Sequence, residues 1–590
     1  MKKSQVVIVI SVLIAGFALV SAVTVFIHPG LPHGQAKDEA TLLELTLFIQ
    51  DNRPYVAPEI DVVADALRRN TKWRINVTSR LYERGRNWSE WLALFAASGA
   101  LPTVFVFPAD GVDTVDRYSE MFVDLERYLA DPQQTPHVNK WLDSRLLDSM
   151  RTFETGRLIG WPLGIGPDLR DPEIRNRYHE QYLDARTHGF YITVREDVLA
   201  ALGYSFVPLS ELQQMLSRDN RRLTDGDVRI TPEIATIEDF EVLLRRIRDS
   251  GVVAPDGTPL IPFGGTDPTI QFGAAFGFYH FRRVNGNIEG FYGSPHAKEF
   301  FRTLNRWYRE DLFDPDPIIA RDHHDALAAK ITAGHVAAWK SWPMDDPEGI
   351  ERALEATLPE ATVRYIPVPR YRSDLPAYTS ALRVGAVQMA AINRNYGQVD
   401  DLVEYLDWLY SDSAQELIVW GDAESGMWHM DDGRRVITDP QLREAIRMNT
   451  LTADGQGPRY YGLPVRTGSS LFATYSSTWV HGLHRHGFNR FLDELRAPIR
   501  YDARHEAKRL AGRSMTSIDG SLMYPRGPEA GKLNNFFWSE SGPHNARLLL
   551  AETDDDFEQA WADVYEAFMS AGNYDAAVSD LARWLETMGY

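Results

Sequence analysis

Several tryptophan residues stand beside polar or turn-forming residues rather than inside long apolar runs. They are Trp161 before Pro162, Trp339 and Trp342 around Lys340-Ser341, and Trp428 after Glu424-Ser425-Gly426-Met427. The C–H faces of a sugar pack on aromatic rings, while its hydroxyl groups need the planar hydrogen-bonding groups of Asp, Asn, Glu and Arg. Tryptophan and carboxylate side chains in neighbouring loops are therefore suited to hold a sugar, although most individual tryptophans serve core packing.

Polar side chains also stand where strands are predicted to end. Asp51 and Asn52 directly follow the first predicted strand, and Asp345 and Asp346 follow Trp342. Ligands of helix-covered sheets bind beyond the carboxyl ends of strands, and we expect the first three tryptophans in loops of that kind. A capping or turn role is the alternative for the acidic residues. The predicted ligand-binding residues are Trp161, Trp339, Trp342, Asp51, Asn52, Asp345 and Trp428.

Other chemistries have weaker signals. Histidines cluster in Asp322-His323-His324-Asp325 and at His481, His484 and His486, but only His481 and His484 have the spacing of a helical metal pair. Solvated polar faces are the simpler interpretation of both clusters. No H-E-x-x-H, P-loop or G-x-S-x-G motif is present, and the 82 Asp and Glu residues could form glycosidase-like pairs in too many ways to be informative. We predict no catalytic residue, no metal and no cofactor.

The composition is that of a globular protein with two or more cores, since 44% of its 590 residues are hydrophobic. A formal net charge of -20 argues against nucleic-acid binding, which depends on clustered Lys and Arg, and mildly disfavours polyanionic ligands. The absence of cysteine excludes disulfide bonds, thiolate metal sites and attachment through a lipid-bearing N-terminal Cys.

The first residues have the order of an export signal. Lys2 and Lys3 precede an apolar run over residues 6–27. Cleavage after Ala22 would remove most of this run, whereas a helix over all of it could span a membrane, and the sequence leaves both alternatives open. We expect an exported protein in either case, with residues 28–40 as a linker.

The apolar pattern predicts alternating strands and helices after this linker. Strands are predicted at residues 43–48, 73–77 and 103–107, with helices at 60–67 and 88–97 between them, which is typical of a parallel sheet covered by helices. The same pattern returns in a second block, with a strand at 190–194 and helices at 198–202, 237–247 and 297–308. A third block has a strand at 384–392 and a helix at 399–409, and the chain becomes mostly helical from residue 439. These elements predict an α/β fold class.

Several motifs resemble those of the ABC-type extracellular solute-binding proteins of family 1, the oligosaccharide-binding kind. The most specific is Ala97-Ser98-Gly99-Ala100-Leu101-Pro102-Thr103-Val104, which resembles the A-S-G-D-L-P-D turn between a helix and the next strand. Gly99 suits the end of a helix and Pro102 the start of a strand. Further segments resemble family motifs in the family's order: residues 156–162, 191–203, 236–240, 307–315, 331–337 and 404–412. The ordered set, covering roughly residues 43–428, carries the resemblance.

The resemblance implies a periplasmic-binding-protein-like fold of two lobes joined by hinge crossings. Its implied parts are a signal peptide or anchor (1–27), a linker (28–40), lobe one (41–165), lobe two (166–380), a return to lobe one (381–425) and C-terminal helices mainly on lobe two (426–590). The implied function is the extracytoplasmic, non-enzymatic component of an ABC importer, in which hinge closure captures a carbohydrate before docking on the membrane permease. We expect a monomer. Two alternatives are a membrane-tethered ligand-sensing receptor and a secreted carbohydrate-active enzyme.

The sequence departs from the family pattern at two places. Ala100 and Thr103 replace the two Asp residues of the A-S-G-D-L-P-D turn, so no role of those carboxylates is transferred. Ala254-Pro255-Asp256-Gly257-Thr258-Pro259 stands where relatives can have an Asp-rich, calcium-loop-like sequence. With one carboxylate, this segment lacks the oxygen ligands that calcium prefers, and we predict no metal there.

Overall fold

The computed structural model describes most of the chain in separate ranges. They are residues 40–50, 58–83, 88–142, 144–166, 191–219, 221–265, 272–273, 275–276, 278, 281–284, 286–314, 323–340, 347–372, 385–443, 502–513 and 527–587. The chain divides after Thr41, and every element below belongs to the part from Leu42 to Tyr590, apart from Thr41 itself at the start of the first strand. The predicted signal or anchor at residues 6–27 lies outside the described residues.

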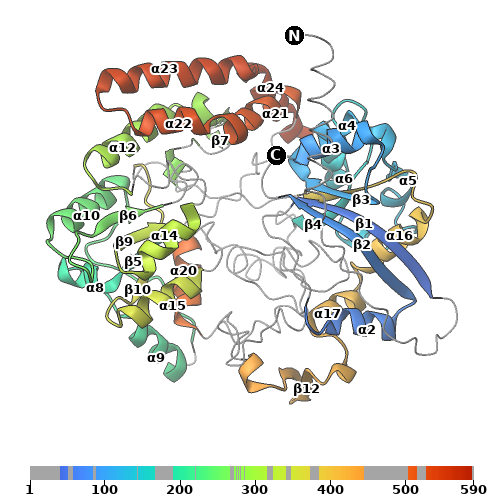
Figure 1. The fold of residues 1–590 in the computed structure, drawn as a ribbon, viewed down its shortest axis with the longest axis horizontal. Helices are drawn as coiled ribbons and strands as arrows, with labels where there is room; N and C mark the ends of the chain where they lie inside the picture. Colours follow the sequence, from blue (N-terminus) through green and yellow to red (C-terminus); the bar gives the residue numbers. More distant parts are fainter. Residues whose placement is uncertain are drawn as a thin grey trace, which may run out of the picture. The chain divides into compact units, whose positions relative to one another are not determined.

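The first sheet has five strands in the order β2-β1-β3-β11-β4 (Figure 1). Their bounds are β1 Thr41–Gln50, β2 Trp73–Glu83, β3 Val104–Pro108, β4 Trp161–Gly166 and β11 Gly385–Ile392. β1 and β3 are parallel, with Phe48 opposite Phe105. β11 is antiparallel to β3 and to β4, with Ala390 opposite Val106 and Trp161. The parallel pairing expected from the first block is confirmed for β1 and β3, while β11 makes the sheet mixed, because apolar periodicity does not encode strand direction.

Side chains from this sheet and from seven helices form its core. The helices are α2 Val62–Asn70, α3 Trp88–Ser98, α4 Val112–Asp116, α5 Glu126–Leu129, α6 Ser144–Met150, α16 Val399–Trp408 and α17 Asp412–Trp420. Phe48 and Phe105 stack at 4.5 Å between ring centroids, and Leu92 of α3 and Leu402 of α16 are fully buried in the same core. Gly99 follows α3 with a φ of 68°, which confirms the predicted helix end.

The second sheet has four strands in the order β10-β5-β9-β6. Their bounds are β5 Tyr191–Arg195, β6 Ile261–Gly264, β9 Val336–Lys340 and β10 Val363–Pro367. β6 and β9 are parallel, whereas β5 is antiparallel to both β9 and β10. The associated helices are α8 Glu196–Ala201, α9 Leu209–Asp219, α10 Ile237–Asp249, α12 Ala297–Arg309, α14 His323–Thr332 and α15 Pro347–Thr357.

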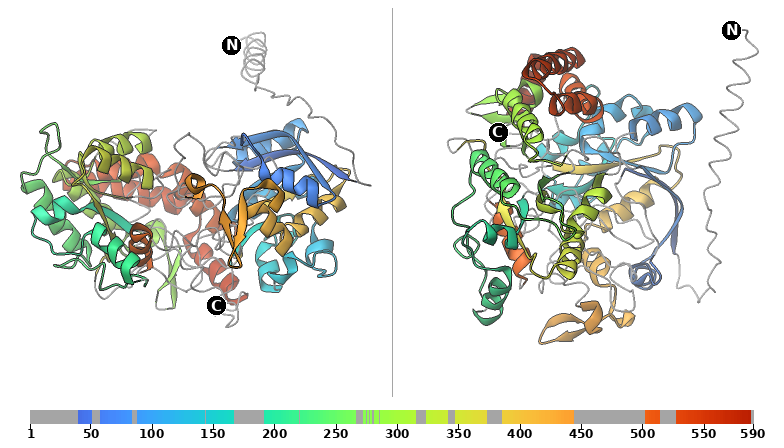
Figure 2. Two further views of the ribbon diagram at one scale, coloured as in Figure 1. Left: turned by 90° about the horizontal axis from the view of Figure 1, so that it is seen from below. Right: turned by 60° about the vertical axis from the view of Figure 1, so that its left-hand side comes forward.

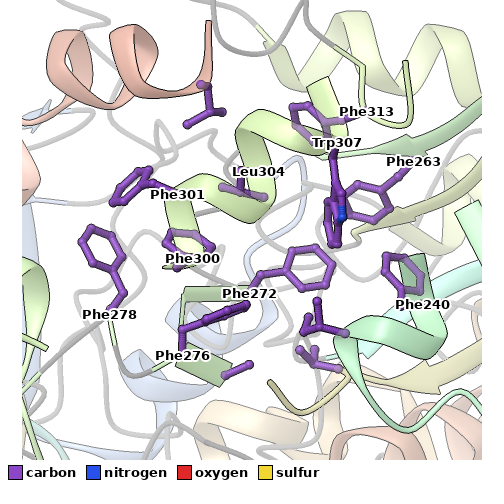
Figure 3. Close-up of a cluster of buried hydrophobic side chains, with 14 of the residues drawn as sticks. Phe240, Phe263, Phe272, Phe276, Phe278, Phe300, Phe301, Leu304, Trp307 and Phe313 are labelled. Atoms are coloured by element: carbon purple, nitrogen blue, oxygen red, sulfur yellow. The ribbon is translucent and has the colours of Figure 1, made fainter. Parts of the chain in front are cut away.

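An unusually aromatic core lies against this sheet. Figure 3 shows its centre, where Phe240, Phe263 and Phe272 surround Trp307, with centroid distances of 5.8, 6.4 and 5.2 Å to the indole. Edge-to-face contacts of this kind add to the free energy of burial. The side chains come from α10, β6, α12 and the segments between them, so the core fixes these elements together.

Helices from the last quarter of the chain complete that core. They are α21 Pro528–Asn535, α22 Gly542–Leu549, α23 Asp554–Ala571 and α24 Tyr574–Thr587, with a π-helical turn at Phe536–Glu540, whereas α20 Ala503–Arg513 packs into two other clusters. α21 to α24, red in Figures 1 and 2, and the turn between them contribute Phe537, Val564 and Phe568 to the aromatic core. A short hairpin of β12 (Trp428–Asp431) and β13 (Arg434–Ile437) instead joins a small cluster with α2 and α17.

Most predicted helices and strands begin and end within three residues of the observed ones, and the α/β class is confirmed. Ile60, expected on the buried face of a helix, is 43% exposed. The helix begins only at Val62, because the carboxylate of Asp61 accepts the backbone N–H of Ala64 at 2.9 Å and caps it.

Candidate functional site

One edge of the first sheet gathers the carboxyl ends of three strands. β1 and β3 are parallel, and β4 has the direction of β3 because both are antiparallel to β11. At this edge Gly385, the first residue of β11, lies opposite Gly166, the last residue of β4. β1 ends here at Gln50, so the chain passes from this edge into Asp51 and Asn52, which lie outside the described residues. This is the edge at which a ligand is expected in a helix-covered sheet.

The second sheet has a corresponding edge. The carboxyl ends of β6 and β9 meet there, with Gly264 opposite Trp339, and β5 begins at the same edge with Tyr191. Lys340 ends β9 and is 1% exposed. The chain then enters the segment that contains Trp342 and Asp345, both outside the described residues. Trp342, the predicted stacking residue, and Asp345, a predicted acceptor, therefore follow the carboxyl end of β9 in the sequence.

Trp161 does not lie in a loop, and this prediction is wrong. It begins β4, pairs with Ala390 and is completely buried, with Tyr410 edge to face at 6.4 Å. β4 is an edge strand, so Pro162 is tolerated although it has no N–H to donate. Gly160 is also a packing requirement, since a Cβ there would lie 2.7 Å from the Cβ of Met389. The ring therefore has no exposed face to offer to a ligand.

Trp339 is likewise misplaced by the sequence prediction. It lies inside β9, between Thr193 of β5 and Gly264 of β6, and is completely buried. Its neighbours in the core include Tyr191 and Tyr365. The strand continues through Trp339 to Lys340, so the predicted loop does not begin at Trp339.

Trp428 lies in a hairpin and already has partners for its polar and aromatic groups. Its indole N–H donates to the carbonyl oxygen of Trp420 at 2.9 Å. The guanidinium of Arg435 stands 5.0 Å from its ring centre, and Trp420 packs edge to face at 6.2 Å. The side chain is half-buried, so these contacts account for part of its surface.

Hydrogen bonds within the loop at residues 254–259 stabilise its conformation. The Asp256 carboxylate accepts the backbone N–H of Thr258 at 3.0 Å and its hydroxyl at 2.7 Å, and these bonds hold the pKa of Asp256 below its ordinary value. Its second oxygen lies 3.2 Å from Nε2 of His335. Within the described ranges no group of three or more His, Cys, Asp or Glu side chains gathers as a metal site would require. The side chains of His323 and His324, and all of His481, His484 and His486, lie outside the described residues.

Burial perturbs titratable groups at the other end of the second sheet. Glu196 lies 3.5 Å from Arg364, and burial raises the pKa of Glu196 and lowers that of Arg364. The strand register pairs Arg195 with Val363 at this end and Tyr191 with Pro367 at the other. The pair therefore lies away from the candidate edge, and its hydrogen bonds to Leu209 and Val207 indicate a structural role.

No helix among the described ranges combines the length and apolarity needed to cross a membrane.

Comparison with known proteins gives matches to solved structures. No protein-family model and no curated protein matches the chain. The alginate-binding protein AlgQ2, solved without calcium ion, is 14% identical with a TM-score of 0.54, over 93% of this chain and 99% of its own. The S. pneumoniae ABC-transporter substrate-binding protein FusA, in complex with kestose, is 13% identical with a TM-score of 0.55, over 93% and 100%. An HMO-binding solute-binding protein from Bifidobacterium longum infantis is 14% identical with a TM-score of 0.51, over 93% and 99%. The fold is that of ABC-transporter solute-binding proteins.

Proposed function

We propose that the chain is the extracytoplasmic substrate-binding component of an ABC importer and that it captures a carbohydrate, an oligosaccharide, without chemical change. The observation that carries this proposal is the likeness, over 93% of the chain, to an alginate-binding protein, an HMO-binding solute-binding protein and a substrate-binding protein in complex with kestose. Two separate sheets, each with carboxyl strand ends gathered at one edge, support the same interpretation. The partners would be the sugar and the permease subunits in the membrane.

The proposed site uses the segments that follow the strand ends. Asp51 and Asn52 after β1, and Trp342 and Asp345 after β9, would supply the hydrogen-bonding groups and the stacking ring. Trp428 stays a candidate ligand-binding residue, because its side chain is only half-buried and part of the ring is accessible. Trp161 and Trp339 are not included, because contact with either ring would require opening an apolar core.

The proposed mechanism is hinge closure between two lobes with the bounds inferred from the sequence: residues 41–165 with 381–425 for lobe one, and 166–380 with the C-terminal helices for lobe two. Periplasmic binding proteins capture their ligands by domain closure of this kind, in which a few residues at the crossings absorb the backbone rotation. We further propose that the protein is a monomer outside the cytoplasm, either released by cleavage after Ala22 or held by the helix at residues 6–27.

A thermal-shift screen followed by calorimetry tests this function. The purified chain would be heated with neutral and uronate-containing oligosaccharides, and a ligand at 100 times its Kd should stabilise by about 2.7 kcal/mol. Product analysis of the same mixtures should show the sugars unchanged. Stabilisation by none of the sugars, or turnover of any of them, would contradict the proposal.

Matched variants test the site. Trp342→Ala should weaken binding by roughly 2 kcal/mol, in the range of an aromatic contact residue, and Asp345→Asn should also weaken it. Trp538→Ala is the control, because Trp538 is a half-buried tryptophan whose N–H donates to Asn534 at 3.0 Å in the C-terminal helices. Equal affinities for Trp342→Ala and Trp538→Ala would exclude the proposed stacking role.

A further inference from the structure

α20 is a highly charged helix that is nevertheless buried. Glu506, Lys508 and Arg509 are 0%, 1% and 7% exposed. Among the described side chains of this helix, the buried apolar ones are small or few: Ala503, Ala507, Leu510 and Ala511. Its contacts with β10, β5 and α9 therefore depend on charge to a degree that is unusual for a core helix.

One face of α20 carries cations that meet anions of α15. Arg504 and Lys508, one helical turn apart, both reach Glu351 at 3.3 Å, and Arg504 also pairs with Glu355. Glu351 is completely buried and accepts the hydroxyl of Tyr365 at 2.6 Å. The Lys508 ammonium stands 4.9 Å from the ring centre of Tyr365.

The other face has the opposite arrangement. Glu506 accepts hydrogen bonds from Arg222 at 2.7 Å and from Arg509 at 3.0 Å. Arg504, Glu506 and Lys508 thus give α20 positive, negative and positive charge in turn. Their partners have the complementary signs, since both cations meet Glu351 and Glu506 meets Arg222. Such complementarity specifies one register, while buried ion pairs add little net stability compared with apolar packing.

Two observations indicate that this docking is specific but not strong. Oε1 of Glu351 is buried without a hydrogen-bond partner among the described residues, so water would stabilise it if the helix moved away. Ala507 and Ala511 are the apolar groups that α20 adds to the cluster of Tyr191 and Tyr365 in β5 and β10, the two strands that α20 contacts, and an alanine side chain buries little area.

From this geometry we propose that α20 is a latch held in register by ion pairs, which leaves the second sheet as a unit while the sheet stays folded and thereby uncovers Tyr191 and Tyr365. The inference does not depend on the proposed function. Local opening of this kind is common for segments with few buried apolar contacts.

The absence of cysteine makes the test direct. Ala507→Cys places a single thiol on the buried face of α20, and Ala338→Cys places one in β9, where Ala338 is 0% exposed against 3% for Ala507. Under native conditions the thiol at position 507 should react with a disulfide reagent about tenfold or more faster than the thiol at position 338. Adding Glu351→Gln should accelerate only the former. Adding Glu558→Gln, which removes an ion-pair partner elsewhere, should change neither rate by more than about fivefold, the limit set by a cost of about 1 kcal/mol.

Equal labelling rates at the two positions, or a common acceleration by Glu351→Gln, would overturn the proposal, because α20 would then open only with global unfolding. Native-state hydrogen exchange of the full chain without cysteine gives an independent readout if either thiol variant fails to fold. Faster exchange of α20 amides than of β5 and β9 amides supports the latch, and identical exchange overturns it.

Discussion

Trp161 and Tyr410 meet edge to face, with their planes at 62° and their ring centroids 6.4 Å apart. The Tyr410 hydroxyl donates to the carbonyl oxygen of Pro162 at 2.7 Å, so α16 and the turn after it are joined to the edge strand β4 by a ring contact and a hydrogen bond. The indole N–H of Trp161 has no hydrogen-bond partner among the described residues. This arrangement indicates that Trp161 stabilises the first sheet.

Trp161→Ala should therefore lower the free energy of unfolding by about 3–5 kcal/mol, since it leaves a large cavity in a closed core. Trp161→Phe should cost less, because it also removes the unpaired N–H. Chemical denaturation measures both. Ligand binding by the folded fraction should be unchanged, and a loss of affinity without a loss of stability would show that the buried position is wrong.

Gly293→Ala should destabilise the chain by roughly 1–3 kcal/mol, because an added Cβ would lie 2.3 Å from the ring of Tyr574. Gly531→Ala is the matched control. Gly531 lies in α21 with no atom within 4 Å of the position that a Cβ would take, so alanine there should stabilise by about 0.4–1 kcal/mol. Thermal unfolding of the two variants should therefore shift in opposite directions.

Alkaline pH should loosen the attachment of α24. Burial raises the pKa of Tyr574 to about 12, while its hydroxyl accepts the N–H of Gly290 at 3.1 Å. A pKa raised in the folded state means that this stability is fully present below about pH 10 and is lost as the pH rises towards 12. Tyr574→Phe should reduce the alkaline loss seen in urea unfolding at pH 9 and pH 11. Tyr565→Phe, at an exposed position, should leave the loss unchanged.

The ion pairs between α12 and α23 should make a small, salt-dependent contribution. Glu558 pairs with Lys298 at 2.5 Å and with Arg302, and all three side chains are partly exposed. Glu558→Gln should cost about 0.2–1 kcal/mol at low salt and less in 1 M salt. Asp555→Asn, in the same helix, is the control for a change in net charge. A double-mutant cycle with Lys298→Met measures the pair directly, and zero coupling would contradict the contact.

The sequence predicts strands and helices well where apolar spacing is regular, as in β1, β3 and α12. It predicts the positions of single side chains poorly where a short sequence pattern is compatible with two local structures. Gly160 and Pro162 are as compatible with an edge strand as with a loop, and only the pairing of β4 with β11 distinguishes them. The burial of α20 could not be predicted from its charged composition, because the burial of Glu506 and Lys508 depends on partners far away in the sequence. The ligand-binding role of Asp51, Asn52, Trp342 and Asp345, which follow β1 and β9 in the sequence, stays a prediction.

The position of β11 has a consequence for biosynthesis. Among the described strands, β4 pairs only with β11, which begins at Gly385, and the aromatic core of the second sheet is incomplete until Phe537 and Phe568 have been synthesised. As the chain emerges from the ribosome, β3 and β4 therefore keep unpaired edges through the synthesis of more than 200 residues between Gly166 and Gly385. Both cores are therefore completed only after most of the chain has been synthesised.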